Sequence, residues 1–123
     1  KRIKYVKNNS NSGIVESLNK GIDLAKGIYI ARQDGDDISL PQRLEQQVNY
    51  LENNPDVSLV GSSIEFFPEY YLWEVPESPC LFDMIKGCPF AHPSVMFRKQ
   101  DFLKFDLFGF LVCITQCSRH FSI

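Results

Sequence analysis

The order of hydrophobic patterns in its first 31 residues limits the folds open to this chain more than any other feature. Residues 3–6 (Ile-Lys-Tyr-Val) have the pattern of a short strand, and residues 28–31 (Ile-Tyr-Ile-Ala) have that of a buried strand. Between them, apolar residues at helical spacing predict an amphipathic helix over residues 13–26. Strand, helix and strand predict a βαβ unit, and therefore an α/β fold with a mostly parallel sheet and flanking helices.

The following residues continue this alternation. A second helix is predicted over residues 41–53, since Pro41 suits a first helical turn, and a strand is predicted over residues 57–60. Residues 64–67 are expected to extend or pair with that strand, and residues 68–79 to form a long aromatic loop. Shorter elements are predicted as a helix at 81–86, a strand at 94–98 and a helix at 100–104.

Composition bounds the class of protein. With 123 residues the chain has the length of one domain, and its net charge of −2 gives no reason to expect nucleic acid as a partner. The apolar stretch at 105–114 is too short to span a membrane, and no signal peptide is visible at the start. We expect a cytoplasmic protein without a transmembrane segment, peripheral at most to the inner membrane face.

The cysteines give little information. All four lie in the second half of the chain, and only Cys113 and Cys117 have metal-like spacing, with His120 nearby. A structural zinc site needs four ligands, and no fourth is evident. We interpret the four cysteines, which are Cys80, Cys88, Cys113 and Cys117, as reduced thiols of a cytosolic protein.

Three carboxylates occur within four residues directly after the strand predicted at 28–31: Asp34, Asp36 and Asp37. Their mutual repulsion is relieved by a hard cation such as Mg²⁺ or Mn²⁺, and ligands in α/β sheets bind beyond the carboxyl ends of strands. A solvated acidic turn that caps the next helix is the alternative. An EF-hand is excluded because Ile38 and Ser39 stand where an oxygen ligand and a glycine are required. A magnesium-dependent phosphohydrolase is a more distant alternative.

The residues around these carboxylates form a longer pattern. Asn-x-Gly occurs at 11–13 and again at 19–21, Ala-x-Gly at 25–27, Asp-x-Asp-Asp at 34–37, and Pro-x-Arg-Leu at 41–44. Downstream follow Asn-Pro at 54–55, Val-Gly at 60–61 and His-Pro-Ser-Val-Met-Phe-Arg-Lys at 92–99. In this order and spacing, residues 1–104 resemble a family 2 glycosyltransferase. The resemblance implies a GT-A fold, which is a Rossmann-like α/β/α sandwich.

The resemblance also implies a function: metal-dependent transfer of a sugar from a nucleotide-diphosphate sugar, a UDP-sugar by analogy, to a glycan or lipid-linked acceptor. It places Asp34 near the donor ribose and Asp36 on an Mn²⁺ or Mg²⁺ ion that bridges the diphosphate, with Asp37 as a secondary metal ligand. Arg32 is a candidate for contact with the donor phosphates, and His92 for the acceptor side. The catalytic base is not assigned.

Two parts of the family pattern are not found. This sequence shows neither the amino-terminal strands that hold the nucleobase in the family nor the Glu-Asp pair that carries the general base. The tail at 105–123 departs from the pattern, as a shifted reading frame would explain. A catalytically inactive remnant or binding fragment is therefore the alternative function. An incomplete sheet would also leave an exposed edge through which the chain self-associates.

Overall fold

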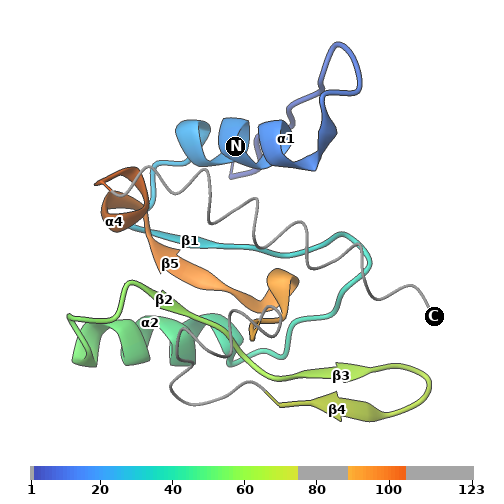
Figure 1. The fold of residues 1–123 in the computed structure, drawn as a ribbon, viewed down its shortest axis with the longest axis vertical. Coiled ribbons are helices and arrows are strands. Elements are labelled where there is room, and N and C mark those ends of the chain that lie inside the picture. Colours follow the sequence, from blue (N-terminus) through green and yellow to red (C-terminus); the bar gives the residue numbers. More distant parts are fainter. Residues whose placement is uncertain (1, 75–88, 105–123) are drawn as a thin grey trace.

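The computed structural model describes residues 2–74 and 89–104 of the chain, which form a small antiparallel sheet with helices on both faces (Figure 1). The sheet contains β1 (Tyr29–Ala31), β2 (Leu59–Val60) and β5 (Met96–Arg98). Their order is β1-β5-β2, and both outer strands pair with β5 in antiparallel fashion. The outer strands therefore run in the same direction, with β5 running against them between the two.

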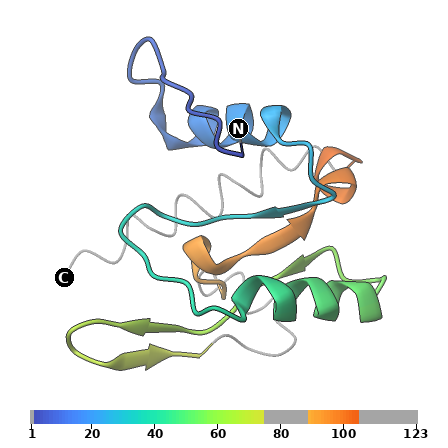
Figure 2. The ribbon, with the colours of Figure 1, turned by 180° about the vertical axis from the view of Figure 1, so that it is seen from behind.

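This pairing corrects the prediction of a mostly parallel sheet. The prediction assumed that strands close in sequence become neighbours, but β5, from a distant part of the chain, lies between β1 and β2. Figure 2 shows β5 in this central place from behind. The mixed α/β architecture itself is confirmed, because helices cover the sheet.

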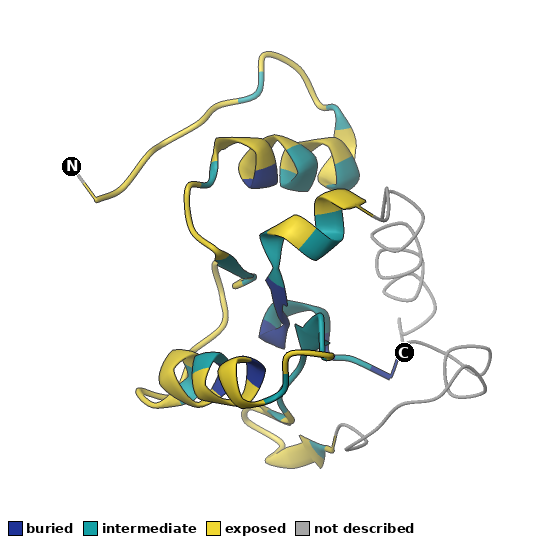
Figure 3. Cartoon of the chain, turned by 90° about the vertical axis from the view of Figure 1, so that its left-hand side faces the viewer, coloured by how far each residue is buried: buried dark blue, intermediate teal, exposed yellow. Residues whose placement is uncertain are grey.

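The two faces of the sheet carry different helices. Ile30, Phe97 and Leu59 are register partners across the three strands, and they pack with α1 (Gly13–Leu24) and Phe102 of α4 (Lys99–Lys104). On the opposite face, α2 (Arg43–Asn53) is held by Arg98, whose guanidinium donates to the backbone oxygens of Leu51 and Val57. The sheet thus separates two helical layers, which Figure 3 shows edge-on.

The helices begin and end close to their predicted bounds. In α1 the side chain of Asn11 accepts a hydrogen bond from the Gly13 amide at 3.1 Å, which satisfies one of the first amides of the helix. At the other end, Lys99 Nζ donates to the Ala25 carbonyl at 2.7 Å, where the helix dipole favours a cation. In α2, Leu51 is fully buried against the sheet.

Two local predictions are wrong. Residues 3–6 form no strand, and Ile3 and Tyr5 are 86% and 83% exposed, because an alternating pattern makes a strand only where a partner strand accepts its hydrogen bonds. Residues 68–79 are not one long loop, since β3 (Ile64–Phe66) pairs with β4 (Tyr71–Trp73) in a separate hairpin. Cross-strand contact of Phe66 with Tyr71, at 6.0 Å between ring centroids, accompanies this pairing.

Other predictions fall on residues that the structure does not describe. These are the helix at 81–86, the tail at 105–123 and all four cysteines with His120. Within residues 2–74 and 89–104, no helix is both long and apolar enough to cross a membrane. Self-association through an exposed sheet edge stays a prediction.

Candidate functional site

The candidate site lies at one edge of the sheet, where three segments meet. Register places Ala31 at the end of β1 and Val60 at the end of β2 on either side of Met96, the first residue of β5. The segment after β1, residues 32–40, is called the acidic loop below. The segment before β5 is the 3-10 turn His92–Ser94, called the His–Pro turn. The antiparallel insertion of β5 therefore brings the His–Pro turn beside the acidic loop.

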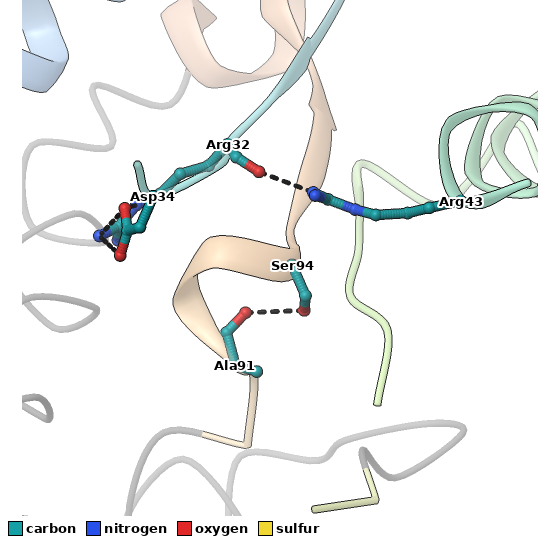
Figure 4. Close-up of polar contacts among 5 residues, drawn as sticks. All are labelled: Arg32, Asp34, Arg43, Ala91 and Ser94. Carbon is teal, nitrogen blue, oxygen red and sulfur yellow. Dashed lines mark hydrogen bonds and ion pairs between the residues drawn. The ribbon is translucent and has the colours of Figure 1, made fainter. Parts of the chain in front are cut away.

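Arg32 and Asp34 form an ion pair at the start of the acidic loop. Arg32 Nη2 lies 3.1 Å from both carboxylate oxygens of Asp34, and Arg32 Nε lies 3.3 Å from Oδ1 (Figure 4). The Arg32 side chain is only 11% exposed, whereas that of Asp34 is 43% exposed. Arg32 Nη1 is buried, and within the described residues it has no hydrogen-bond partner. The Nη1 amino group of a buried cation is thus left for a further acceptor.

Asp36 and Asp37 stand on the exposed side of the same loop. The Asp37 amide donates to the Asp34 carbonyl at 3.3 Å, which closes a tight turn around Gly35. Partial burial and then the charges of Asp34 and Asp36 raise the pKa of Asp37, while Arg32 and Arg43 oppose this rise. The three carboxylates are therefore close enough to repel one another, as the sequence spacing implied.

Whether the acidic loop fits a divalent cation depends on how its carboxylates are arranged. Among residues 2–74 and 89–104, no group of three His, Cys, Asp or Glu side chains is arranged to hold a metal by itself. Mg²⁺ is commonly held by one or two protein carboxylates and completes its shell with substrate phosphates and water. Since Asp34 is paired with Arg32, the exposed carboxylates of Asp36 and Asp37 fit that smaller ligand set.

His92 belongs to the same site. Burial and, to a smaller extent, the charge of Arg32 lower its pKa to about 4, while the charge of Asp34 opposes this. The imidazole is therefore neutral at pH 7, so it can accept or donate a hydrogen bond without adding a charge. The structure brings together Arg32, Asp34 and His92, which the sequence proposed separately.

Arg43 is a member of the site that the sequence analysis did not single out. From the first turn of α2, its Nη2 donates to the Arg32 carbonyl at 2.7 Å, and its Nη1 donates to Gln33 Oε1 at 3.0 Å and Ser39 Oγ at 2.8 Å. Burial lowers the pKa of Arg43, and the charge of Asp37 opposes this. Its place in the Pro-x-Arg-Leu pattern was the signal that could have identified it.

Gln47 and Ser94 complete the support beneath the site, and both are buried. Gln47 Nε2 donates to the Ser94 carbonyl at 2.7 Å, and Ser94 Oγ contacts the Ala91 carbonyl at 2.7 Å. The same hydroxyl accepts from the Ser62 amide at 3.1 Å. These bonds tie the His–Pro turn to α2 on one side and to the segment after β2 on the other.

Comparison with known proteins gives a consistent result. Residues 1–119 match the family described as Glycosyl transferase family 2. The chain is 43% identical over 103 residues to EpsE of Bacillus subtilis, a protein named as a glycosyltransferase, and the match covers 79% of this chain and 36% of EpsE. It is 41% identical over 115 residues to an uncharacterized glycosyltransferase of Methanocaldococcus jannaschii, covering 86% of this chain and 40% of that protein.

A third relative carries a more specific name. The amylovoran biosynthesis glycosyltransferase AmsE of Erwinia amylovora is 36% identical over 95 residues, and the match covers 72% of this chain and 35% of AmsE. The chain therefore spans between a third and two-fifths of the length of these relatives.

Proposed function

Since the chain belongs to glycosyl transferase family 2, we propose that it forms the part that binds the donor diphosphate in an enzyme that transfers a sugar from a nucleotide-diphosphate sugar to a glycan or lipid-linked acceptor. The name of AmsE, which refers to amylovoran biosynthesis, supports a role of this kind in biosynthesis. By the family resemblance the donor is a UDP-sugar.

One observation carries this proposal: three mutually repelling carboxylates stand at the carboxyl ends of β1 and β2, beside a buried arginine with an N–H group to spare. In this scheme Asp36 holds Mg²⁺ or Mn²⁺, Asp37 assists it, and Asp34 lies near the donor ribose. A bound cation would supply positive charge to the leaving diphosphate. Arg32 Nη1 would donate a hydrogen bond to an anionic oxygen of the same group.

His92 has a different role in this scheme. Because its pKa is lowered to about 4, it is neutral at pH 7 and contributes no charge toward the phosphates. A neutral imidazole instead suits a hydrogen bond with a hydroxyl group, which is what a sugar acceptor presents. We therefore assign His92 to the acceptor side of the site, as a binding residue rather than the general base.

The test is a calorimetric titration of the protein with UDP in the presence and absence of Mn²⁺. Asp36→Ala should abolish the metal-dependent binding, because it removes the carboxylate proposed to hold the cation. Asp56→Ala is the matched control, since Asp56 is an exposed carboxylate in the turn after α2, away from the candidate site. Equal Mn²⁺-dependent binding of UDP by wild type and Asp36→Ala would refute the assignment.

A further inference from the structure

The buried face of α2 connects two segments that are far apart in sequence. Gln47 is 5% exposed, and it donates from Nε2 to the Ser94 carbonyl at 2.7 Å while accepting at Oε1 from Arg43 Nε at 3.3 Å. Since both ends of the amide are engaged, its orientation is fixed by its two partners. Gln47 therefore joins the His–Pro turn to Arg43, one helical turn earlier on α2.

Arg43 continues the connection into the acidic loop. Its guanidinium donates to the Arg32 carbonyl, to Gln33 Oε1 and to Ser39 Oγ, at 2.7, 3.0 and 2.8 Å. These partners lie at the beginning and near the end of the loop, so one rigid, planar group holds both of its arms. The carboxylates of Asp36 and Asp37 are carried on the segment between those arms.

The sheet itself gives a shorter connection between the two segments. The Arg32 amide donates to the Val95 carbonyl at 2.9 Å, at the point where the pairing of β1 with β5 ends. Beyond that bond, the side chains of α2 carry the connection outward to Ser39 on one side and to Ser94 on the other.

We propose that Arg43 and Gln47 are positioning residues, which hold the acidic loop and the His–Pro turn at a fixed separation through one face of α2. This inference rests on the proposed function only in treating Asp36, Asp37 and His92 as groups that bind substrate. Neither positioning residue touches substrate. The geometry of the arginine fork matters more than its charge, so lysine cannot replace it: one ammonium group cannot reach the Arg32 carbonyl, Gln33 and Gln47 together.

A first test needs no ligand. Gln47→Met is compared with Gln46→Met, which makes the same chemical change at an exposed neighbour on the same helix. In Gln47→Met we expect the Arg32 amide to exchange with solvent about tenfold faster, and the pKa of His92, followed by NMR, to move from about 4 toward 6.5. Gln46→Met should match wild type in both measurements.

A second variant guards against loss of the fold. Gln47 is buried, and a Gln47→Met variant that does not fold cannot be measured. Arg43→Lys keeps the charge at a half-buried position and is judged by the same two measurements. A wild-type Arg32 exchange rate and a wild-type His92 titration in the folded variants would overturn the proposal.

A third measurement separates positioning from general stability. With UDP and Mn²⁺ as probes, Arg43→Lys should weaken UDP binding about tenfold at a temperature where the variant is fully folded. Arg43→Ala should weaken UDP binding similarly, and millimolar guanidinium should restore part of the affinity by occupying the space that the arginine side chain leaves. Unaltered affinity in both variants would overturn the proposal. Absence of UDP binding in wild type would instead refute the proposed function, and the ligand-free measurements would still decide the positioning role.

Discussion

Replacing Ser94 by alanine should lower the free energy of unfolding by about 2 kcal/mol. The side chain is 3% exposed, and its hydroxyl oxygen lies 3.1 Å from the Ser62 amide nitrogen, 2.9 Å from the Ser62 carbonyl and 2.7 Å from the Ala91 carbonyl. A hydroxyl has one proton, so it donates to one carbonyl at a time while it accepts from the Ser62 amide. Alanine can do neither.

The magnitude follows from what is left behind. The Ser62 amide loses its acceptor in a partly buried place, which costs about 1–3 kcal/mol, whereas the carbonyls keep other lone pairs and lose about 0.5–1 kcal/mol between them. Partial access of water to the segment after β2 reduces the first contribution, which gives the total of about 2 kcal/mol. For a chain of this length such a loss lowers the melting temperature by roughly 8 °C.

Urea denaturation followed by circular dichroism measures this difference directly. Ser10→Ala is the matched control, because Ser10 is exposed and lies in the segment before α1. It should stay within about 0.5 kcal/mol of wild type. A Ser94→Ala variant that is no less stable than Ser10→Ala would refute the claim that this hydroxyl anchors the His–Pro turn.

Two further predictions concern the same edge of the sheet. A Cβ atom at Gly61 would lie 2.9 Å from Phe90 Cδ1, so Gly61→Ala should lower the free energy of unfolding, measured in urea, by about 1–3 kcal/mol. Gly21→Ala, where a Cβ meets nothing within 4 Å, should not destabilise the protein. Equal stability of the two variants would contradict this prediction. His92 takes up a proton near pH 6.5 in the unfolded state but only near pH 4 in the folded state, so protonation favours unfolding. As the pH falls from 6.5 to 4, the free energy of unfolding of wild type should therefore fall by about 1–2 kcal/mol relative to His92→Gln, after allowance for solvent screening. Identical dependence of stability on pH in the two proteins would exclude the effect.

The helices and the strands β1 and β2 could be predicted from the sequence because their signals are local. Apolar residues at helical spacing lie within the helices that they specify, and Asn11 and Pro41 each lie two residues before a helix. The predicted helix at 13–26 corresponds to Gly13–Leu24, and that at 41–53 to Arg43–Asn53. The bounds differ by two residues at the end of the first helix and at the beginning of the second, since periodicity does not fix the terminal residues of a helix.

Strand pairing could not be predicted in the same way. The stretch at 94–98 reads as a strand, but nothing in its own residues says that it lies between β1 and β2 and runs against both. The antiparallel register, Tyr29 with Arg98 and Ala31 with Met96, depends on side chains from several elements that pack together. The hairpin of β3 and β4 was missed because its aromatic residues and Pro68 suggested a loop.

The candidate site shows the same division between local and distant information. The spacing of Asp34, Asp36 and Asp37 is enough to predict their mutual repulsion, and the structure agrees in the raised pKa of Asp37. The lowered pKa of His92 could not be predicted, because it needs burial and the approach of Arg32 from the acidic loop. The insertion of β5 between β1 and β2 supplies both the burial of His92 and its proximity to Arg32.

A site built in this way separates two requirements. The exposed carboxylates of Asp36 and Asp37 need freedom to meet a ligand, whereas the frame beneath them needs rigidity to keep their distance from His92. Gln47 and Ser94 supply the rigidity at 5% and 3% exposure, where water does not compete for their hydrogen bonds. Changes in the frame should therefore alter both stability and ligand affinity, whereas changes to the exposed carboxylates should alter affinity alone.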